Sequence, residues 1–248
     1  MEVGTSSSTP KRSKTTVSII GNIGAGKSTL IVELKKHKEI GTKSVLVPED
    51  VGSFKVELEA FYNDQKKGAE PLQTAISKSN SARLSQATTY ADALPDCLVI
   101  ISERSNFDTF HTFVQIQRDA GNLRECFVAD LKSTLHVPEY LFYLDTPPSV
   151  CFDRIKTRNR PGEENIQKDY LDKLDTKHIE LAKRYTAKGR TLIDPKSDRS
   201  LCSTLIDPVT GSTLLVLDHG YSHEDMITCI TWCLALSPTT PILAGVKG

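Results

Sequence analysis

The segment GNIGAGKST occupies residues 21–29 and matches the P-loop pattern. Its glycines let the backbone curl so that successive N–H groups face an anion. A β-branched run precedes it and helical apolar spacing follows, which places the loop between a strand and the positive end of a helix. Lys27 is then expected to reach the β- and γ-phosphates of ATP, and Ser28 to ligate Mg²⁺. The residues predicted to bind the nucleotide here are Gly21, Asn22, Ile23, Gly24, Ala25, Gly26, Lys27, Ser28 and Thr29.

Five short apolar runs have the character of strands that are buried on both faces. Segments with helical spacing lie between them, at roughly 71–94 and 166–185. Strands that alternate with helices favour a parallel sheet covered on both sides. We therefore predict an α/β P-loop kinase fold with a five-stranded parallel sheet flanked by helices. The predicted strands are Val17–Ile20, Val45–Val47, Leu98–Ile101, Leu141–Leu144 and Leu214–Leu217.

The domain organisation follows from the less regular segments. Residues 1–14 are rich in Ser, Thr, Lys and Arg and have no apolar periodicity, which predicts a disordered tail. Residues 188–212 are rich in Asp, Pro, Ser, Thr and Gly, which predicts a long surface loop. The rest is expected to form a single domain over residues 15–240.

Composition argues against several partners and compartments. The 31 basic and 31 acidic residues balance, so no electrostatic footprint for nucleic acid is present. The apolar runs are too short for a membrane span, and the N-terminus lacks the apolar core of a secretory signal. No CxxC pair occurs among the six cysteines, and Cys229 and Cys233 are expected to lie reduced and buried on one helical face. A cytoplasmic protein fits best, with a mitochondrial one less favoured.

The residues that follow the third predicted strand distinguish between classes of P-loop protein. The NKxD element by which GTPases read guanine is absent. Leu98–Ile101 is followed closely by Glu103 and Arg104, an acid–base pair at the carboxyl end of a central strand. Ligands bind at that edge of an open α/β sheet, beside the phosphate loop. This layout is typical of a kinase for small molecules.

Five sequence motifs follow one another between Val17 and Leu181. They are GNIGAGKSTL at 21–30, VPED at 47–50, AFYNDQKKGAEPLQ at 60–73, ISERSNFDTF at 101–110 and CFDRIKTRNRPGEENIQKDYLDKL at 151–174. In content and order they resemble the deoxyribonucleoside kinase family, cellular and viral enzymes for deoxycytidine, deoxyadenosine, deoxyguanosine and thymidine. The resemblance implies ATP-dependent phosphorylation of a deoxyribonucleoside at its 5′-hydroxyl, in nucleotide salvage, by a homodimer.

The resemblance also implies catalytic roles. Glu49 matches the general base that takes the proton of the 5′-hydroxyl, which requires an acceptor within hydrogen-bond reach. Arg104 would contact the 5′ oxygen and the phosphate, and with Lys27 it completes the implied catalytic set. Ser28 and Glu103 would hold Mg²⁺.

Further matches concern the nucleoside. Tyr62 and Glu163 match positions that hold the sugar 3′-hydroxyl, although Glu164 can take the place of Glu163 if the alignment shifts by one. Gln73 matches the amide that reads the Watson–Crick edge of the base, and aromatic residues flank it. The implied substrate-binding residues are Glu49, Phe54, Tyr62, Gln73, Arg104, Thr109, Phe113 and Glu163.

A run of arginines resembles the lid of the family, at about residues 154–165. Arg154 and Arg158 lie four residues apart, so they share one helical face, and Arg160 follows. In the family such a lid folds arginines over the transferring phosphoryl group, where guanidinium groups offset negative charge. These three arginines are therefore expected to contact the nucleotide.

Departures from the family pattern affect which base the site is expected to accept. Asn80 and Thr109 stand where kinases for deoxycytidine and deoxyadenosine carry an Arg and an Asp, and Pro161 and Gly162 stand where acids are usual in the lid. The amide of Gln73 can flip to pair with thymine or cytosine, and Thr109 leaves room near the pyrimidine 5-position. We therefore expect pyrimidines to be preferred over purines.

Two other functions share the P-loop. A nucleoside monophosphate kinase such as thymidylate kinase would need an additional anion site for the substrate phosphate. A regulator that binds nucleotide without turnover would have little reason to keep Glu49, Arg104 and the lid arginines together. Incubation with ATP and each deoxynucleoside or its monophosphate separates the three hypotheses.

Overall fold

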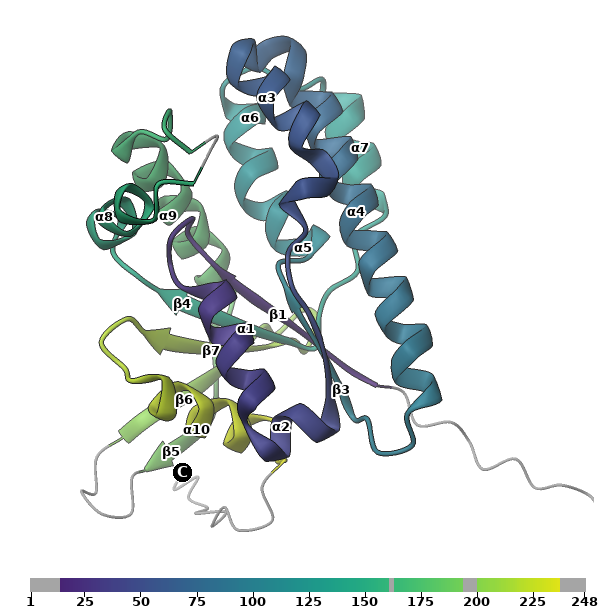
Figure 1. Ribbon diagram of the computed structural model, residues 1–248, viewed down its shortest axis with the longest axis vertical. Helices are drawn as coiled ribbons and strands as arrows, with labels where there is room; N and C mark the ends of the chain where they lie inside the picture. Colours follow the sequence, from purple (N-terminus) through teal and green to yellow (C-terminus); the bar gives the residue numbers. More distant parts are fainter. Residues whose placement is uncertain (1–13, 161–162, 194–199, 237–248) are drawn as a thin grey trace, which may run out of the picture.

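The computed structural model describes residues 14–160, 163–193 and 200–236 (Figure 1). The predicted tail, apart from Lys14, lies outside these ranges, as do Pro161 and Gly162 and residues 237–240 of the predicted domain. A seven-stranded sheet in the order β2-β3-β1-β4-β7-β6-β5 forms its centre. The strands are β1 Thr15–Gly21, β2 Ser44–Val47, β3 Val99–Glu103, β4 Tyr140–Asp145, β5 Ala187–Ile193, β6 Ser200–Ile206 and β7 Thr213–Asp218.

The five predicted strands are confirmed as the parallel part of this sheet. β1 pairs in parallel with β3 and β4, β2 with β3, and β4 with β7. The predicted number of strands is wrong, because the predicted loop at 188–212 contains two more. β5 and β6 form an antiparallel hairpin that joins the sheet through β7. The α/β P-loop fold is confirmed.

The hairpin escaped prediction because it buries few apolar side chains. Leu192 is the one buried residue of β5, and Cys202 and Thr204 are the buried residues of β6. Antiparallel strands commonly keep one face in water, so only about every second side chain of such a strand turns inward. A stretch rich in Ser, Thr and Asp with so few inward side chains is hard to distinguish from a loop.

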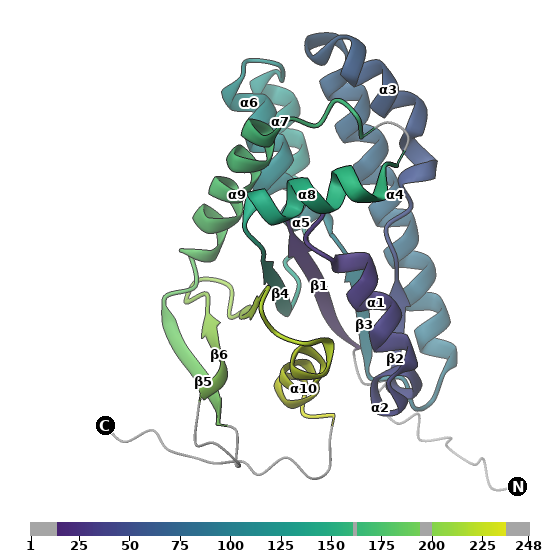
Figure 2. The same cartoon turned by 60° about the vertical axis from the view of Figure 1, so that its left-hand side comes forward.

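Helices cover both faces of the sheet (Figure 2). Val17 and Ile19 belong to the same buried cluster as apolar residues of several helices, whereas Ile20 belongs to a different cluster. Successive side chains of a strand point to opposite faces, so these clusters lie on the two sides of β1. On the first face lie α1 Lys27–Lys36 and α10 His223–Cys233; on the second lie α4 Gln65–Ala93, α5 Asn106–Thr109 and the carboxyl end of α9 Lys168–Ala182.

The two long predicted helices are confirmed with altered ends. α4 begins six residues before Pro71, because the side chain of Asp64 accepts a hydrogen bond from the backbone N–H of Lys67 and caps the helix. Cys229 and Cys233 lie buried and unpaired on α10, as expected. Among the described residues, no helix has both the length and the apolar character that crossing a membrane requires.

A group of helices stands at the carboxyl edge of the sheet, at the top of Figure 1. Phe54, Phe61, Leu72, Phe110 and Val114 pack together in a separate apolar cluster that joins this group. It forms a wall opposite the phosphate loop. The remaining helices are α2 Lys38–Lys43, η1 Val51–Phe54, α3 Lys55–Asn63, the π-helix η2 Phe110–Val114, α6 Gln115–Asp119, α7 Glu125–Ser133 and α8 Pro148–Arg158.

Candidate active site

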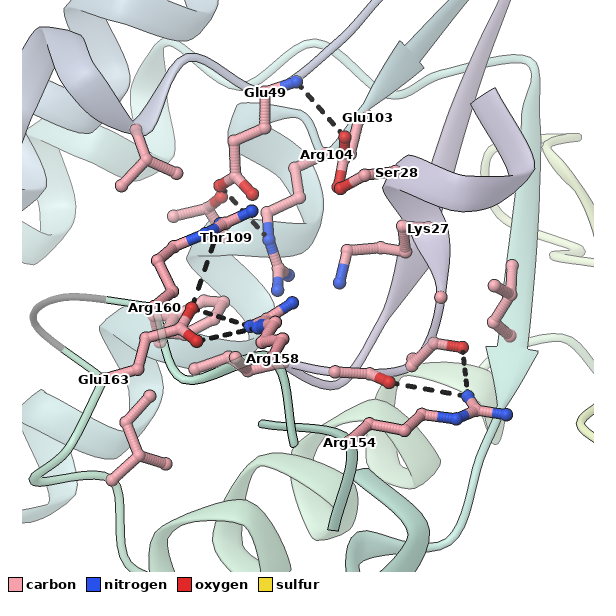
Figure 3. A pocket seen from close by; sticks show the side chains of 18 of the residues that line it. Lys27, Ser28, Glu49, Glu103, Arg104, Thr109, Arg154, Arg158, Arg160 and Glu163 are labelled. Carbon is pink, nitrogen blue, oxygen red and sulfur yellow. Dashed lines mark hydrogen bonds and ion pairs between the residues drawn. The ribbon is translucent and has the colours of Figure 1, made fainter. Parts of the chain in front are cut away.

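A cavity of about 660 Å³ lies at the carboxyl ends of the parallel strands (Figure 3). Its lining includes residues 23–30 after β1, Glu49 after β2, Glu103 at the end of β3, Leu144 of β4 and His219 after β7. Ligands bind at this edge of open α/β sheets because the loops there converge around a crevice. The motifs that the sequence analysis singled out therefore meet in one place.

The phosphate loop has the backbone that its glycines predict. Gly24 and Gly26 have φ values of 82° and 104°, in the left-handed region. A Cβ atom on Gly24 would lie 2.6 Å from the backbone oxygen of Cys151, so α8 packs directly against the loop. Gly21 and Asn22 do not line the cavity, and Asn22 instead donates from its side chain to the backbone oxygen of Leu171 at 2.9 Å.

Lys27 is almost completely buried beneath this loop. Its ammonium donates to the backbone oxygens of Gly21 at 3.1 Å and Asn22 at 2.7 Å. Burial, helped by the positive charge of Arg104, lowers the pKa of Lys27 to about 7. The charges of Glu49, Glu103 and Asp108 oppose this shift only in part, so an anionic phosphate would favour the charged form of the ammonium.

A chain of polar contacts links the phosphate loop to the predicted base. The hydroxyl of Ser28 donates to Glu103 Oε1 at 2.8 Å, and the backbone N–H of Glu49 donates to Glu103 Oε2 at 3.3 Å. Glu49 Oε1 in turn lies 3.3 Å from Nε of Arg104. The structure therefore brings together four residues that come from three separate motifs (Figure 3).

The oxygen atoms of Ser28 and Glu103 suit Mg²⁺. This ion is commonly held by one or two carboxylates together with substrate phosphates and water. Among the described residues there is no cluster of three or more His, Cys, Asp or Glu side chains able to hold a metal by itself. The donor set therefore fits a magnesium ion shared with nucleotide phosphates.

Arg104 has an unusual backbone conformation and lies beside a carboxylate that was not singled out from the sequence. Its φ is 60°, its side chain is 5% exposed, and its guanidinium carbon lies 4.7 Å from the ring centre of Phe113. Asp108, completely buried, places Oδ2 3.7 Å from Nη1 of Arg104. Asp108 Oδ1 accepts from the backbone N–H and hydroxyl of Ser105 at 2.5 and 2.8 Å, a capping box at the start of α5.

Burial raises the pKa of Asp108, and the nearby charge of Arg104 opposes that shift. Arg104 therefore lies between two carboxylates, those of Glu49 and Asp108. The spacing of Ser105 and Asp108 is that of a capping box, which was the signal available in the sequence.

The predicted nucleoside residues line the cavity beyond Arg104. They come from η1, α3, α4, α5, η2 and the lid, and include Phe54, Tyr62, Gln73, Thr109, Phe113 and Glu163. Asn80 does not line it but is buried one turn beyond Ile76 on α4. Several apolar and aromatic residues that line the cavity were not identified from the sequence: Val51, Leu58, Phe61, Leu72, Ile166 and Tyr170.

The three arginines of the predicted lid have protein partners. Arg154 donates to the backbone oxygen of Ala25 at 3.1 Å, beside the phosphate loop. Arg158 forms a two-pronged pair with Glu163, with distances of 2.7 Å from Nε and 2.6 Å from Nη2, and Nη1 of Arg160 lies 3.9 Å from the same carboxylate. Between the two candidate acids, Glu163 rather than Glu164 lines the cavity.

The family model described as deoxynucleoside kinase matches residues 17–207, well over half of the chain. The chain belongs to the deoxynucleoside kinase family. This match confirms the resemblance inferred from the five motifs, and it shows that the chain is a kinase.

This family member resembles kinases that are named for different nucleosides. It is 30% identical over 197 residues to deoxycytidine kinase 1 from Xenopus laevis, which covers 65% of this chain and 71% of that enzyme. It is 29% identical over 165 residues to the thymidine kinase of Ictalurid herpesvirus 1, which covers 61% and 67%. A structure of deoxyadenosine kinase from M. mycoides shares its fold, with a TM-score of 0.65 at 22% identity over 89% of this chain and 98% of that one.

The deoxynucleoside kinase has further cavity residues near the start of α10. His219 and Tyr221 lie within the segment after β7, and His223 and Met226 belong to the first turns of the helix. Gln117, one turn beyond Phe113, also lines the cavity, and its Oε1 accepts from Asn122 at 2.8 Å. The sequence indicates Gln117 only through its position four residues after Phe113, which places both side chains on one helical face.

Proposed function

We propose that this kinase transfers the γ-phosphoryl group of ATP to the 5′-hydroxyl of a deoxyribonucleoside, with pyrimidines favoured, and so serves nucleotide salvage. The observation that carries the proposal is the pair formed by Glu49 and Arg104, 3.3 Å apart, in the same cavity as the phosphate loop. A carboxylate there can accept a proton while the guanidinium stabilises the oxygen that loses it.

Each residue of the site has a role in this reaction. Glu49 accepts the proton of the 5′-hydroxyl as its oxygen attacks. Lys27 and Arg104 stabilise negative charge on the transferred group, and the lid arginines approach it from the opposite side. Ser28 and Glu103 would hold Mg²⁺, which when bound supplies further charge neutralisation on the phosphates.

The relatives support the substrate class, since those named above are kinases for deoxycytidine, thymidine and deoxyadenosine. The preference for pyrimidines rests on the cavity wall. Gln73 and Thr109 both line it, and a Gln amide can pair with either pyrimidine. Thr109 is small enough to leave room for a methyl group at the 5-position.

The test is a panel of acceptors with ATP and Mg²⁺: the four deoxynucleosides and their four monophosphates. We expect monophosphate products from the nucleosides, fastest with pyrimidines, and no diphosphate products. The matched control is Glu49→Gln, which keeps the shape of the side chain and removes the base. Diphosphate formation from monophosphates alone would overturn the proposal in favour of a nucleoside monophosphate kinase.

A further inference from the structure

Asp108 places a buried carboxylate beside the site without lining the substrate cavity. Its side chain is 0% exposed, whereas the next residue, Thr109, lines the cavity. Oδ2 of Asp108 and Nη1 of Arg104 lie 3.7 Å apart, and neither atom has a hydrogen-bond partner among the described residues. A buried charge is costly unless an opposite charge offsets it. These two groups therefore act as counter-charges for each other.

Hydrogen bonds fix the orientation of this carboxylate. Oδ1 accepts from the backbone N–H and the hydroxyl of Ser105 at 2.5 and 2.8 Å, and from the hydroxyl of Ser18 in β1 at 3.4 Å. Because Oδ1 is occupied, Oδ2 is the oxygen that remains for Arg104. Burial raises the pKa of Asp108, whereas Arg104 and the hydrogen bonds from Ser105 favour its carboxylate form.

Arg104 is shared between two carboxylates, and one of them faces the cavity. Its Nε lies 3.3 Å from Oε1 of Glu49, which lines the cavity, while Nη1 faces Asp108, which does not (Figure 3). The backbone N–H of Arg104 also donates to the backbone oxygen of Ile19 at 3.1 Å. Both Arg104 and Asp108 are thus anchored to β1, the strand that leads into the phosphate loop.

We propose that Asp108 is a positioning residue that holds the guanidinium of Arg104 beside the base and the transferred phosphoryl group, an inference that rests on the proposed function. Its negative charge limits how strongly Arg104 attracts the carboxylate of Glu49, which leaves that carboxylate free to take the proton of the 5′-hydroxyl. Once Glu49 has accepted the proton and become neutral, Asp108 still supplies a counter-charge for Arg104.

Asp108→Asn removes the charge with little change of shape, because the amide oxygen can still accept from Ser105. The NH₂ group then faces Nη1 of Arg104, which is also a donor. We expect kcat with thymidine to fall about tenfold or more, since Arg104 is no longer held in place and its attraction for Glu49 is no longer balanced. The KM for thymidine should stay within about threefold, because Asp108 does not line the cavity.

Thr112→Val is the matched control for a purely structural role of Asp108. The buried hydroxyl of Thr112 donates to the backbone oxygen of Asp108 at 2.7 Å, so this variant loses a hydrogen bond at the same residue but keeps the carboxylate. It should lower the free energy of unfolding and leave kcat within about twofold of the wild type.

A double-mutant cycle shows whether Asp108 acts through Arg104. Added to Arg104→Ala, Asp108→Asn should not lower the residual kcat further, because the group that it positions is gone. If Asp108→Asn fails to fold, Asp108→Ser, whose hydroxyl can also accept from Ser105, gives the same comparison. An unchanged kcat in the single variant, or equal losses with and without Arg104, would overturn this inference alone. Failure of the wild type to phosphorylate any deoxynucleoside would instead overturn the proposed function.

Discussion

At the scale of single residues, the charge state of Lys27 links the site to pH. Its pKa of about 7 lies far below the ordinary 10.5, since the buried ammonium has lost its water. Between these values the unfolded chain binds more protons than the folded one, so this residue makes the ligand-free protein more stable as pH rises through that window. Bound phosphates reverse the effect by favouring the charged ammonium.

We therefore predict that ATP binding at about pH 8.5 takes up close to one proton, because the polyphosphate raises the pKa of Lys27. Titration calorimetry in buffers of different ionisation enthalpy measures the uptake. Lys27→Met should abolish it and, with the fixed cation gone, should also abolish turnover. Equal uptake in the wild type and the variant would assign the proton to another group.

Glu49→Gln should bind nucleoside almost normally and lose about 10²-fold or more in kcat, the usual contribution of a positioned base. The amide keeps the size of the side chain and a partner for Arg104, so the KM for nucleoside should change little. Steady-state kinetics separate the two constants. Losses of similar size in binding and in rate would point to a structural role for Glu49.

At the scale of elements, the segment predicted to be a lid has an ion pair at its surface. Among its described residues, Arg158 pairs with Glu163, and the Arg158 side chain is 34% exposed, so solvent weakens the attraction. Bound phosphates would compete with Glu163 for Arg158. The sugar 3′-hydroxyl would compete with Arg158 for Glu163. The pair therefore suits an open lid that exchanges partners when substrates bind.

We predict that amide hydrogen exchange in residues 154–165 slows when a bisubstrate analogue binds, because its phosphates supply partners for the arginines. Arg158→Ala should lessen this protection, while Lys156→Ala, on the same helix but outside the cavity, should leave it intact. Exchange rates that stay the same with and without the analogue would argue against a lid.

Some elements of the fold and of the site could be predicted from the sequence, and others could not. The phosphate loop and the Glu103–Arg104 pair are local patterns, so their place at the ends of strands followed from their neighbours in the chain. The β5–β6 hairpin depends on the pairing of β6 with β7, which two strands with few buried side chains do not signal in the sequence. The side chain of Asn80 is held by Arg83, which also donates to the backbone oxygen of Pro48, far away in sequence. Such tertiary contacts leave no periodicity to detect.

At the scale of the whole molecule, the hairpin is attached to the sheet and to α10. Arg190 of β5 donates to the backbone oxygen of Cys233 at 2.7 Å and lies 4.8 Å from the ring centre of Trp232. Trp232 is the single tryptophan of the chain, so its fluorescence reports on this contact. The homodimer implied by the family resemblance stays a prediction, which sedimentation equilibrium can check.

Arg190→Ala should lower the free energy of unfolding by about 1 kcal/mol, through loss of a hydrogen bond and a cation–π contact at the surface. Its tryptophan emission should shift to the red. Since Arg190 does not line the cavity, kcat/KM should stay within about twofold of the wild type. Denaturant titration measures the stability, with the exposed Lys188→Ala on the same strand as control. A large loss of activity with unchanged stability would contradict this assignment.

The central claim is that the cavity phosphorylates a nucleoside 5′-hydroxyl, and one measurement tests it most directly. Purified protein is incubated with ATP, Mg²⁺ and thymidine, and the products are followed by ³¹P NMR, with 5′-deoxythymidine as an acceptor that lacks the reacting hydroxyl. We predict thymidine 5′-monophosphate and ADP in equal amounts from thymidine, and neither product above background from 5′-deoxythymidine. ATP hydrolysis at the same rate with both acceptors, without the monophosphate, would contradict the account.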